Sequence, residues 1–160
     1  MKNSMFVLTV IVFYGFFAAC NNPMEGGDQS DGNRFIYPVQ TPIRISAFFG
    51  WQKDPFTEVR RFHSAIDLAG NIGTPVMAAM SGTVSKTGYH QIYGNYIILY
   101  HGKGYETVYA HLSVLSVKQG DKVRQGDKLA EMGISGLSTG PHLHFSIFKN
   151  KIPVNPLDLL

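Results

Sequence analysis

Short runs in which apolar and polar residues alternate recur along most of the chain, and turn-forming residues separate them. Alternation with a period of two places one face of a strand in a core and the other toward solvent, so these runs predict β-strands. Clusters of Gly, Pro, Asn and Asp mark the ends of the runs. The predicted strands cover residues 43–49, 65–68, 75–79, 82–87, 95–100, 105–110, 128–132 and 142–148. The pattern is typical of an all-β domain.

Glycine-containing turns organise two further stretches of the chain. Residues 96–100 are rich in β-branched and aromatic side chains, and segment 101–104 predicts a turn that folds the chain back into 105–109. Residues 117–122 are nearly repeated at 123–128, and each copy contains Gln-Gly-Asp-Lys, which predicts a tight turn. The basic side chains of the repeat could attract an anionic polymer, but a solvated turn surface is the simpler interpretation.

Composition limits the size of the core and excludes one class of partner. The 160 residues, of which 44% are hydrophobic, can fill one core but hardly two, so we expect one domain. The 17 Gly and 8 Pro are spread along the chain, which favours short strands joined by turns over a helical bundle. The formal net charge of +3 is too small to indicate binding to nucleic acid.

The N-terminus has the pattern of an export signal. Lys2 precedes an apolar run, and the small pair Ala18 and Ala19 stands directly before Cys20. The run is too short for an ordinary transmembrane helix. Residues 17–20 resemble a bacterial lipoprotein cleavage box, although Phe17 stands where leucine is usual. This resemblance implies a signal peptide over 1–19 and lipidation of Cys20; a plain secretory signal with an incidental cysteine is the alternative.

Residues 20–33 predict a flexible tether between the lipid anchor and a globular domain over 34–160. The stretch is rich in turn formers and nearly lacks large apolar side chains, so it cannot offset the entropy of ordering. We therefore expect a membrane-anchored lipoprotein of the cell envelope. Asn22 is not the aspartate that retains enteric lipoproteins in the inner membrane. In a host with two membranes, this favours the outer membrane, facing the periplasm.

Two histidines lie two residues apart in the predicted strand 142–148. Leu143 and Phe145 can enter the core, while His142 and His144 project from the other face. Their backbones are then about 7 Å apart. That spacing suits one metal ligand beside one catalytic imidazole; a surface strand whose histidines have no role is the alternative.

A histidine and a carboxylate lie four residues apart at His63 and Asp67. The glycines and proline of 70–75 and the alternation around Asp67 favour strand or loop over helix. A fully extended chain would separate the two backbones by about 13 Å, which is too far for both to bind one ion. A shared ion therefore requires a bend or bulge between them. Such a pair also occurs often by chance.

Together the two motifs supply the three protein ligands of a catalytic zinc site, which leaves a fourth position open. His63, Asp67 and His144 give two imidazoles and one carboxylate, so the site keeps a net positive charge when zinc is bound. His142 and His111 are then left as free imidazoles for proton transfer and oxyanion stabilisation. The chain has no His-Glu-x-x-His motif, so histidines must take the place of a glutamate base.

From about residue 48 onward the chain resembles the LytM/lysostaphin-type zinc metallopeptidases, which are peptidoglycan endopeptidases. The matching segments are His63-x-x-x-Asp67, Gly73-Thr74-Pro75-Val76, Gly82-x-Val84, Tyr93-Gly94-Asn95-Tyr96, Tyr109-Ala110-His111-Leu112-Ser113, Gly136-x-Ser138-Thr139-Gly140-Pro141-His142-Leu143-His144-Phe145 and Val154-Asn155-Pro156-Leu157. The resemblance implies a compact antiparallel β-sandwich or barrel-like domain with a groove over the metal. It implies zinc ligands at His63, Asp67 and His144, and catalytic histidines at His111 and His142.

The chain departs from the family pattern at two positions. Ser146 stands where glutamate is frequent, and Trp51 follows Phe49-Gly50 where arginine is common. Both changes leave the ligands intact. His101 matches a turn position at which relatives often carry histidine, and we interpret it as structural. Trp51, Phe56 and Tyr89 could line a substrate groove, although ordinary packing is the simpler interpretation for aromatic residues.

These features favour a zinc-dependent endopeptidase that hydrolyses amide bonds in peptidoglycan peptide cross-links through metal-activated water. In a diderm host, the resemblance and the anchor favour the D-alanyl–diaminopimelate cross-link over a glycine bridge. The expected partners are stem peptides and the membrane, and a protein regulator is left open. One alternative is a non-catalytic lipoprotein that regulates a separate cell-wall amidase, because some relatives have lost zinc ligands. Another is a zinc hydrolase acting on sugar or another amide.

Overall fold

The computed structural model describes residues 34–40, 44–54 and 57–160. Three of the sequence predictions lie outside the described residues: the signal peptide, the lipidated Cys20 and the tether. Residue 43, the first of a predicted strand, and Phe56 also lie outside them. A helix able to span a membrane does not occur in this described part of the chain.

The described residues form strands and one short 3-10 helix, in agreement with the predicted all-β class. The elements are β1 (Arg44–Ala47), β2 (Gly50–Lys53), β3 (Arg60–His63), β4 (Ile66–Ala69), β5 (Pro75–Met77), β6 (Gly82–His90), β7 (Gly94–Tyr100), β8 (Tyr105–Leu115), β9 (Lys122–Val123), β10 (Lys128–Met132), β11 (His142–Lys149), β12 (Ile152–Val154) and η1 (Pro156–Asp158).

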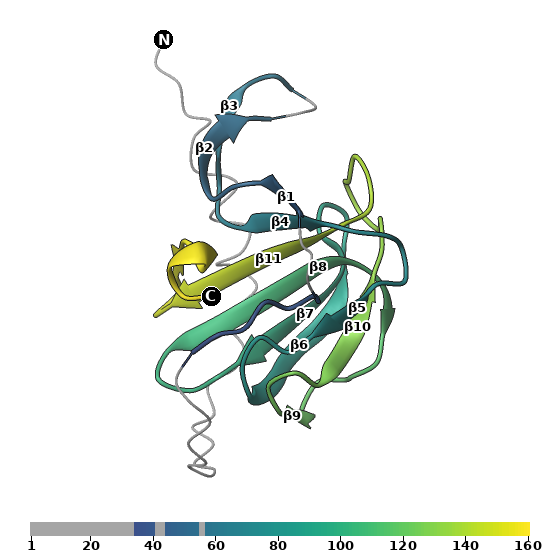
Figure 1. The fold of residues 1–160 in the computed structure, drawn as a ribbon, viewed down its shortest axis with the longest axis vertical. Coiled ribbons are helices and arrows are strands. Elements are labelled where there is room, and N and C mark those ends of the chain that lie inside the picture. Colours follow the sequence, from purple (N-terminus) through teal and green to yellow (C-terminus); the bar gives the residue numbers. More distant parts are fainter. Residues whose placement is uncertain (1–33, 41–43, 55–56) are drawn as a thin grey trace. The chain divides into compact units, whose positions relative to one another are not determined.

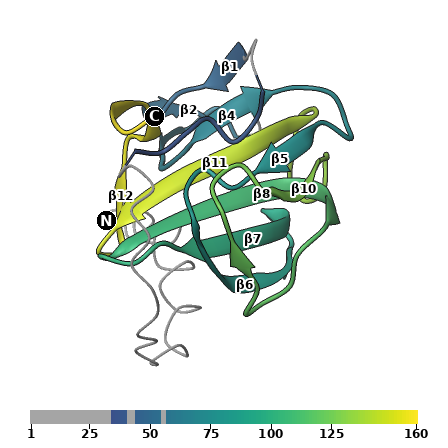
Figure 2. The same cartoon turned by 60° about the horizontal axis from the view of Figure 1, so that its bottom comes forward.

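Ten of these strands belong to one antiparallel sheet, in the order β1-β4-β11-β8-β7-β6-β9 (Figure 1). The long strand β8 lies between β11 and β7 and also pairs with β10, which in turn pairs with β5. Figure 2 shows β11, β8, β7 and β6 in succession, with β12 at one end of β11. The predicted hairpin of 96–100 and 105–109 is confirmed as part of β7 and β8.

The predicted strand over 43–49 is wrong at its C-terminal end. β1 stops at Ala47, and the chain turns into β2 at Gly50, whose φ of 121° is open to glycine and unfavourable for other residues. Strands β2 and β3 form a separate two-stranded sheet with Trp51 opposite Phe62. Alternation in such short elements is too brief to distinguish a strand from a loop, so the sequence did not predict them.

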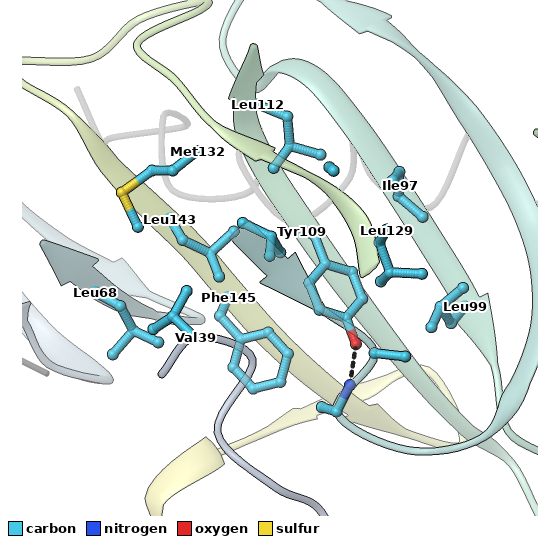
Figure 3. Packing of buried hydrophobic residues seen from close by; sticks show 14 of the residues in the cluster. Val39, Leu68, Ile97, Leu99, Tyr109, Leu112, Leu129, Met132, Leu143 and Phe145 are labelled. Carbon is cyan, nitrogen blue, oxygen red and sulfur yellow. Dashed lines mark hydrogen bonds between the residues drawn. The ribbon is translucent and has the colours of Figure 1, made fainter. Parts of the chain in front are cut away.

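The core is formed by apolar side chains from the inner face of the large sheet (Figure 3). Leu143 and Phe145 are fully buried, as their alternation predicted, and Tyr109 packs against Phe145 with ring centroids 5.3 Å apart. The buried Tyr109 hydroxyl accepts a hydrogen bond from the backbone N–H of Ala79 at 2.9 Å. A buried hydroxyl with a partner costs little, so Tyr109 can anchor the centre of the sheet.

His101 belongs to a buried polar network that reaches this tyrosine. His101 Nδ1 lies 2.9 Å from the carbonyl oxygen of Ser81, to which it must donate, and Nε2 lies 2.7 Å from Thr107 Oγ1. The hydroxyls of Thr107 and Tyr109 are hydrogen-bonded at 3.1 Å. Burial lowers the pKa of His101 to about 4. The network therefore holds His101 as a neutral imidazole, consistent with a structural role.

We expect His101 to make folding stability fall below neutral pH. Its pKa is lower in the folded chain than its ordinary value of 6.5, so its contribution is present above pH 6.5 and is lost as the pH falls toward 4. Between pH 7 and pH 4.5, the wild type should lose roughly 1 to 3 kcal/mol more unfolding free energy than His101→Gln, which cannot take up the proton. Urea unfolding at both pH values measures the difference, and parallel losses in the two proteins would contradict the expectation.

Candidate metal and catalytic site

Three elements bring His63, Asp67 and His144 together. Asp67 in β4 lies directly opposite His144 in β11, so cross-strand pairing places their side chains side by side. His63 is the last residue of β3, and Ser64 and Ala65 break the strand before β4 begins. The predicted bend between His63 and Asp67 is therefore confirmed.

The facing atoms of these residues form a small triangle. His63 Nε2 lies 3.2 Å from His144 Nδ1 and 3.3 Å from Asp67 Oδ1, and His144 Nδ1 lies 2.9 Å from Asp67 Oδ1. Ligand atoms on a tetrahedral zinc ion, with metal–nitrogen distances near 2.05 Å, are about 3.3 Å apart. The triangle thus has the dimensions of three ligands around one zinc ion. The roles of these residues as ligands stay predictions.

Hydrogen bonds and charges prepare the three groups for a cation. His63 Nδ1 donates to the carbonyl oxygen of Phe48 at 3.0 Å, which leaves the lone pair on Nε2 facing the triangle. Burial raises the pKa of Asp67, but hydrogen bonds and charge from His144 and His63 outweigh it and hold that pKa well below its usual range. Burial lowers the pKa of His144, against the opposite effect of Asp67. Neutral imidazoles and an ionised carboxylate are the states that a metal ion requires.

His142 faces the same site from the start of β11. Its Nδ1 donates to the carbonyl oxygen of Gly140 at 2.8 Å, and its Nε2 lies 3.8 Å from Asp67 Oδ2. The ring of His111 is next to it, with centroids 4.6 Å apart. Because the Nδ1 proton is fixed by a carbonyl, Nε2 of His142 carries the lone pair toward the site. The shared strand face predicted for His142 and His144 is confirmed.

His111 reaches this site through a β-bulge in β8. Along a regular strand, His111 would share the face of Tyr109 and point into the core. Instead Ala110 and His111 together oppose the single residue Tyr96, and His111 adopts a left-handed φ of 62°. The bulge returns Leu112 to the core and turns His111 toward His142. His111 Nδ1 donates to Ser135 O at 2.8 Å, and burial lowers the pKa of His111 to about 4.

The loop that holds His111 is fixed by close backbone packing. Ser135 Oγ accepts from Asn95 N at 2.9 Å and donates to Leu112 O at 2.7 Å. A Cβ added to Gly136 would lie 2.3 Å from the backbone nitrogen of Gly94, and its φ of 77° also favours glycine. The loop can approach the bulge this closely only because both positions lack a side chain.

Tyr93 lies beside the site, and sequence reasoning gave it no role of its own. Tyr93 accepts a hydrogen bond from His111 N through its carbonyl at 2.8 Å, and its ring centroid lies 5.7 Å from that of His144. Burial raises the pKa of Tyr93, and the positive charge of Arg61 lowers it in smaller part. Trp51 and Tyr89 are 56% and 64% exposed. The sequence contained Tyr93 in a matching motif, but its contacts depend on the packing of distant segments.

Comparison with known proteins places this geometry in a family. Residues 61–156 match the model of Peptidase family M23. The chain is 43% identical over 131 residues to the DD-carboxypeptidase/endopeptidase Mpg of Neisseria meningitidis, covering 82% of this chain and 30% of that protein. It is 40% identical over 122 residues to the peptidoglycan DD-endopeptidase ShyA of Vibrio cholerae, covering 76% and 28%.

A solved structure extends the likeness to three dimensions. A zinc-containing peptidase from Vibrio cholerae superposes with a TM-score of 0.73 at 36% identity, over 78% of this chain and 39% of that one. The chain thus spans about a third of the length of these relatives. The match to the family model runs from β3 to η1, so it includes the three predicted zinc ligands and the two predicted catalytic histidines. The resemblance inferred from the sequence is confirmed: the chain belongs to Peptidase family M23.

Proposed function

We propose that this domain is a zinc-dependent endopeptidase that hydrolyses amide bonds in the peptide cross-links of peptidoglycan. The observation that carries the proposal is the triangle of His63 Nε2, Asp67 Oδ1 and His144 Nδ1, with sides of 2.9 to 3.3 Å. Zinc, when bound by these atoms, supplies Lewis-acid activation of water and of the scissile carbonyl. Relatives named as peptidoglycan DD-endopeptidases support the substrate class.

In this proposal, His111 and His142 move the protons. Each ring donates its Nδ1 proton to a backbone carbonyl, which leaves Nε2 to take a proton from the attacking water or, once protonated, to donate to the oxyanion or the leaving amine. Asp67 Oδ2 lies 3.8 Å from His142 Nε2, so the carboxylate stands directly beside the nitrogen that is to carry the proton. The carbonyls fix the orientation of both rings before substrate binds.

The proposal includes a place for the enzyme in the cell. Lipidation of Cys20 and a tether over residues 20–33 would hold the domain at a membrane surface of the cell envelope. In a diderm host, this is the outer membrane, facing the peptidoglycan. The supporting observation is the sequence around Cys20. Membrane fractionation of wild type and Cys20→Ser tests the anchor: the variant should appear in the soluble fraction, and its continued sedimentation with membranes would argue for another mode of attachment.

A non-catalytic regulator of a wall amidase is not favoured. Such a protein has no need for three ligand atoms at zinc spacing or for two imidazoles with fixed Nδ1 protons. In this chain all five side chains are present and converge. The relatives named as endopeptidases also support catalysis over regulation.

Mass spectrometry of digested peptidoglycan tests the function and the bond together. Purified full-length chain, loaded with zinc, should release new free amino and carboxyl ends at cross-links and convert dimeric muropeptides into monomers. Unchanged muropeptides across a range of zinc concentrations would contradict the proposal and favour the regulator.

A further inference from the structure

Arg61 stands on the site face of the two-stranded sheet. In β3 the exposure alternates, with Arg60 and Phe62 exposed, Arg61 half-buried and His63 buried. The outward face is marked by Trp51, whose ring centroid lies 5.7 Å from that of Phe62 and 5.8 Å from the guanidinium carbon of Arg60. Arg61 therefore shares the opposite face with His63.

The Arg61 side chain leaves β3 two residues before His63, and its guanidinium is held in place. Two residues along one strand face correspond to about 7 Å, so Arg61 begins one such step from His63. Its charge acts on the hydroxyl of Tyr93, whose ring packs beside His144. Arg61 Nε forms an ion pair with Asp54 Oδ2 at 2.7 Å. Asp54 is itself fixed, because its Oδ1 accepts from Thr57 N and Oγ1 at 2.8 and 3.1 Å.

An arginine held in this way is prepared to bind an anion. The side chain of Arg61 remains 40% exposed, although its Nε atom is buried, so the exposure belongs to other parts of the side chain. A planar guanidinium whose orientation is fixed by one carboxylate can present its outer nitrogens to a second, bidentate carboxylate. The proposed mechanism assigns no role to this charge.

We propose that Arg61 binds a carboxylate on the carbon that bears the scissile nitrogen of the substrate. The inference rests on the proposed function. In a D-alanyl–diaminopimelate cross-link this carbon carries a free carboxylate, and so does the terminal residue of a stem ending in D-alanyl-D-alanine. An internal amide of a glycine bridge has none. Arg61 thus selects substrates with a negative charge next to the bond that is cut.

Kinetics on matched substrates test this role. The zinc-loaded full-length chain should cleave a synthetic D-alanyl–diaminopimelate dimer with about 10- to 100-fold higher kcat/KM than the same dimer with that carboxyl amidated, the range expected for one charge-assisted contact. Arg61→Gln should reduce this ratio to near one while cleaving the amidated dimer as fast as wild type. Arg61→Lys keeps the positive charge but lacks the two parallel N–H donors of a guanidinium. Its ratio of the two kcat/KM values should therefore lie between those of wild type and Arg61→Gln. Arg60→Gln, on the opposite face, is the matched control and should keep the wild-type ratio.

Other outcomes decide against the inference. An Arg61→Gln protein that keeps the preference, or one that loses the same factor on both dimers, would show that Arg61 does not recognise the carboxylate. A stem pentapeptide ending in D-alanyl-D-alanine identifies the source of the carboxylate. If Arg61→Gln lowers kcat/KM equally for the pentapeptide and for the dimer, Arg61 recognises both substrates. If only cleavage of the dimer is affected, the role of Arg61 is restricted to cross-links.

A binding measurement separates this inference from the proposed function. Isothermal titration of chelator-treated wild type and Arg61→Gln with the free and amidated dimers involves no turnover. If wild type binds the free acid more tightly and the variant does not, Arg61 recognises the carboxylate even where hydrolysis fails. If hydrolysis occurs but neither assay distinguishes the two dimers, the proposed endopeptidase function is supported and the proposed role of Arg61 is refuted.

Discussion

His144→Ala should abolish both zinc binding and hydrolysis of peptidoglycan. The substitution leaves two protein ligands, and a catalytic zinc ion normally requires three. His144 Nδ1 contributes the two shorter sides of the ligand triangle, at 2.9 Å to Asp67 and 3.2 Å to His63. Since removal of a group that only supports a ligand lowers metal affinity by about 10- to 100-fold, loss of the ligand itself should cost at least about 100-fold. Elemental analysis after dialysis, together with muropeptide analysis, measures both effects.

A chelator provides the control for folding in this experiment. Metal that binds only the folded chain raises its apparent stability, so removal of zinc should lower the melting temperature of wild type. The same treatment should leave His144→Ala nearly unchanged. His90→Ala replaces a histidine outside the triangle and should retain wild-type zinc content. Full zinc content in dialysed His144→Ala would overturn the ligand assignment.

The convergence of His63, Asp67 and His144 was predictable because it depends on local patterns and one distance limit. The period of two in β11 placed His142 and His144 on one face, opposite Leu143 and Phe145. The length of an extended chain required a bend between His63 and Asp67, which the structure contains at residues 64–65. What the sequence could not supply was the register that sets Asp67 opposite His144, because pairing between β4 and β11 joins residues 77 positions apart.

Strand alternation alone gives the wrong face for His111. A regular β8 would bury it beside Tyr109, and only a left-handed residue in a bulge turns it to the site. Nothing local in Tyr109-Ala110-His111-Leu112 signals this bulge, since the segment contains no glycine and positive φ is uncommon for residues other than glycine. The loop around Gly136 and the carbonyl of Tyr93 fix the bulge from outside the strand. Arg61 was missed for a similar reason, because β3 was too short to be recognised as a strand.

His111→Ala should keep zinc and lose most turnover. The His111 ring does not belong to the ligand triangle but lies next to the His142 ring at a tilt of 56°, with its Nδ1 proton fixed by Ser135 O. Loss of a positioned proton-transfer or oxyanion-stabilising group lowers kcat by about 10²- to 10⁴-fold. Muropeptide release under zinc saturation measures kcat, and elemental analysis checks that the metal remains. Wild-type turnover would remove His111 from the mechanism, and loss of zinc would make it a ligand.

Comparison with His111→Gly tests whether the left-handed backbone at residue 111 lowers the stability of the fold and is kept because the imidazole is needed for catalysis. A Cβ at φ near 62° is unfavourable by about 1 to 2 kcal/mol, whereas glycine adopts this angle freely but loses more entropy on folding. His111→Gly should therefore be about as active as His111→Ala, which is nearly inactive, yet more stable by up to about 1 kcal/mol in urea unfolding. A glycine variant less stable than the alanine variant would mean that the bulge relaxes once the imidazole is gone. The left-handed angle would then be a consequence of the Ser135 hydrogen bond and not a fixed feature of β8.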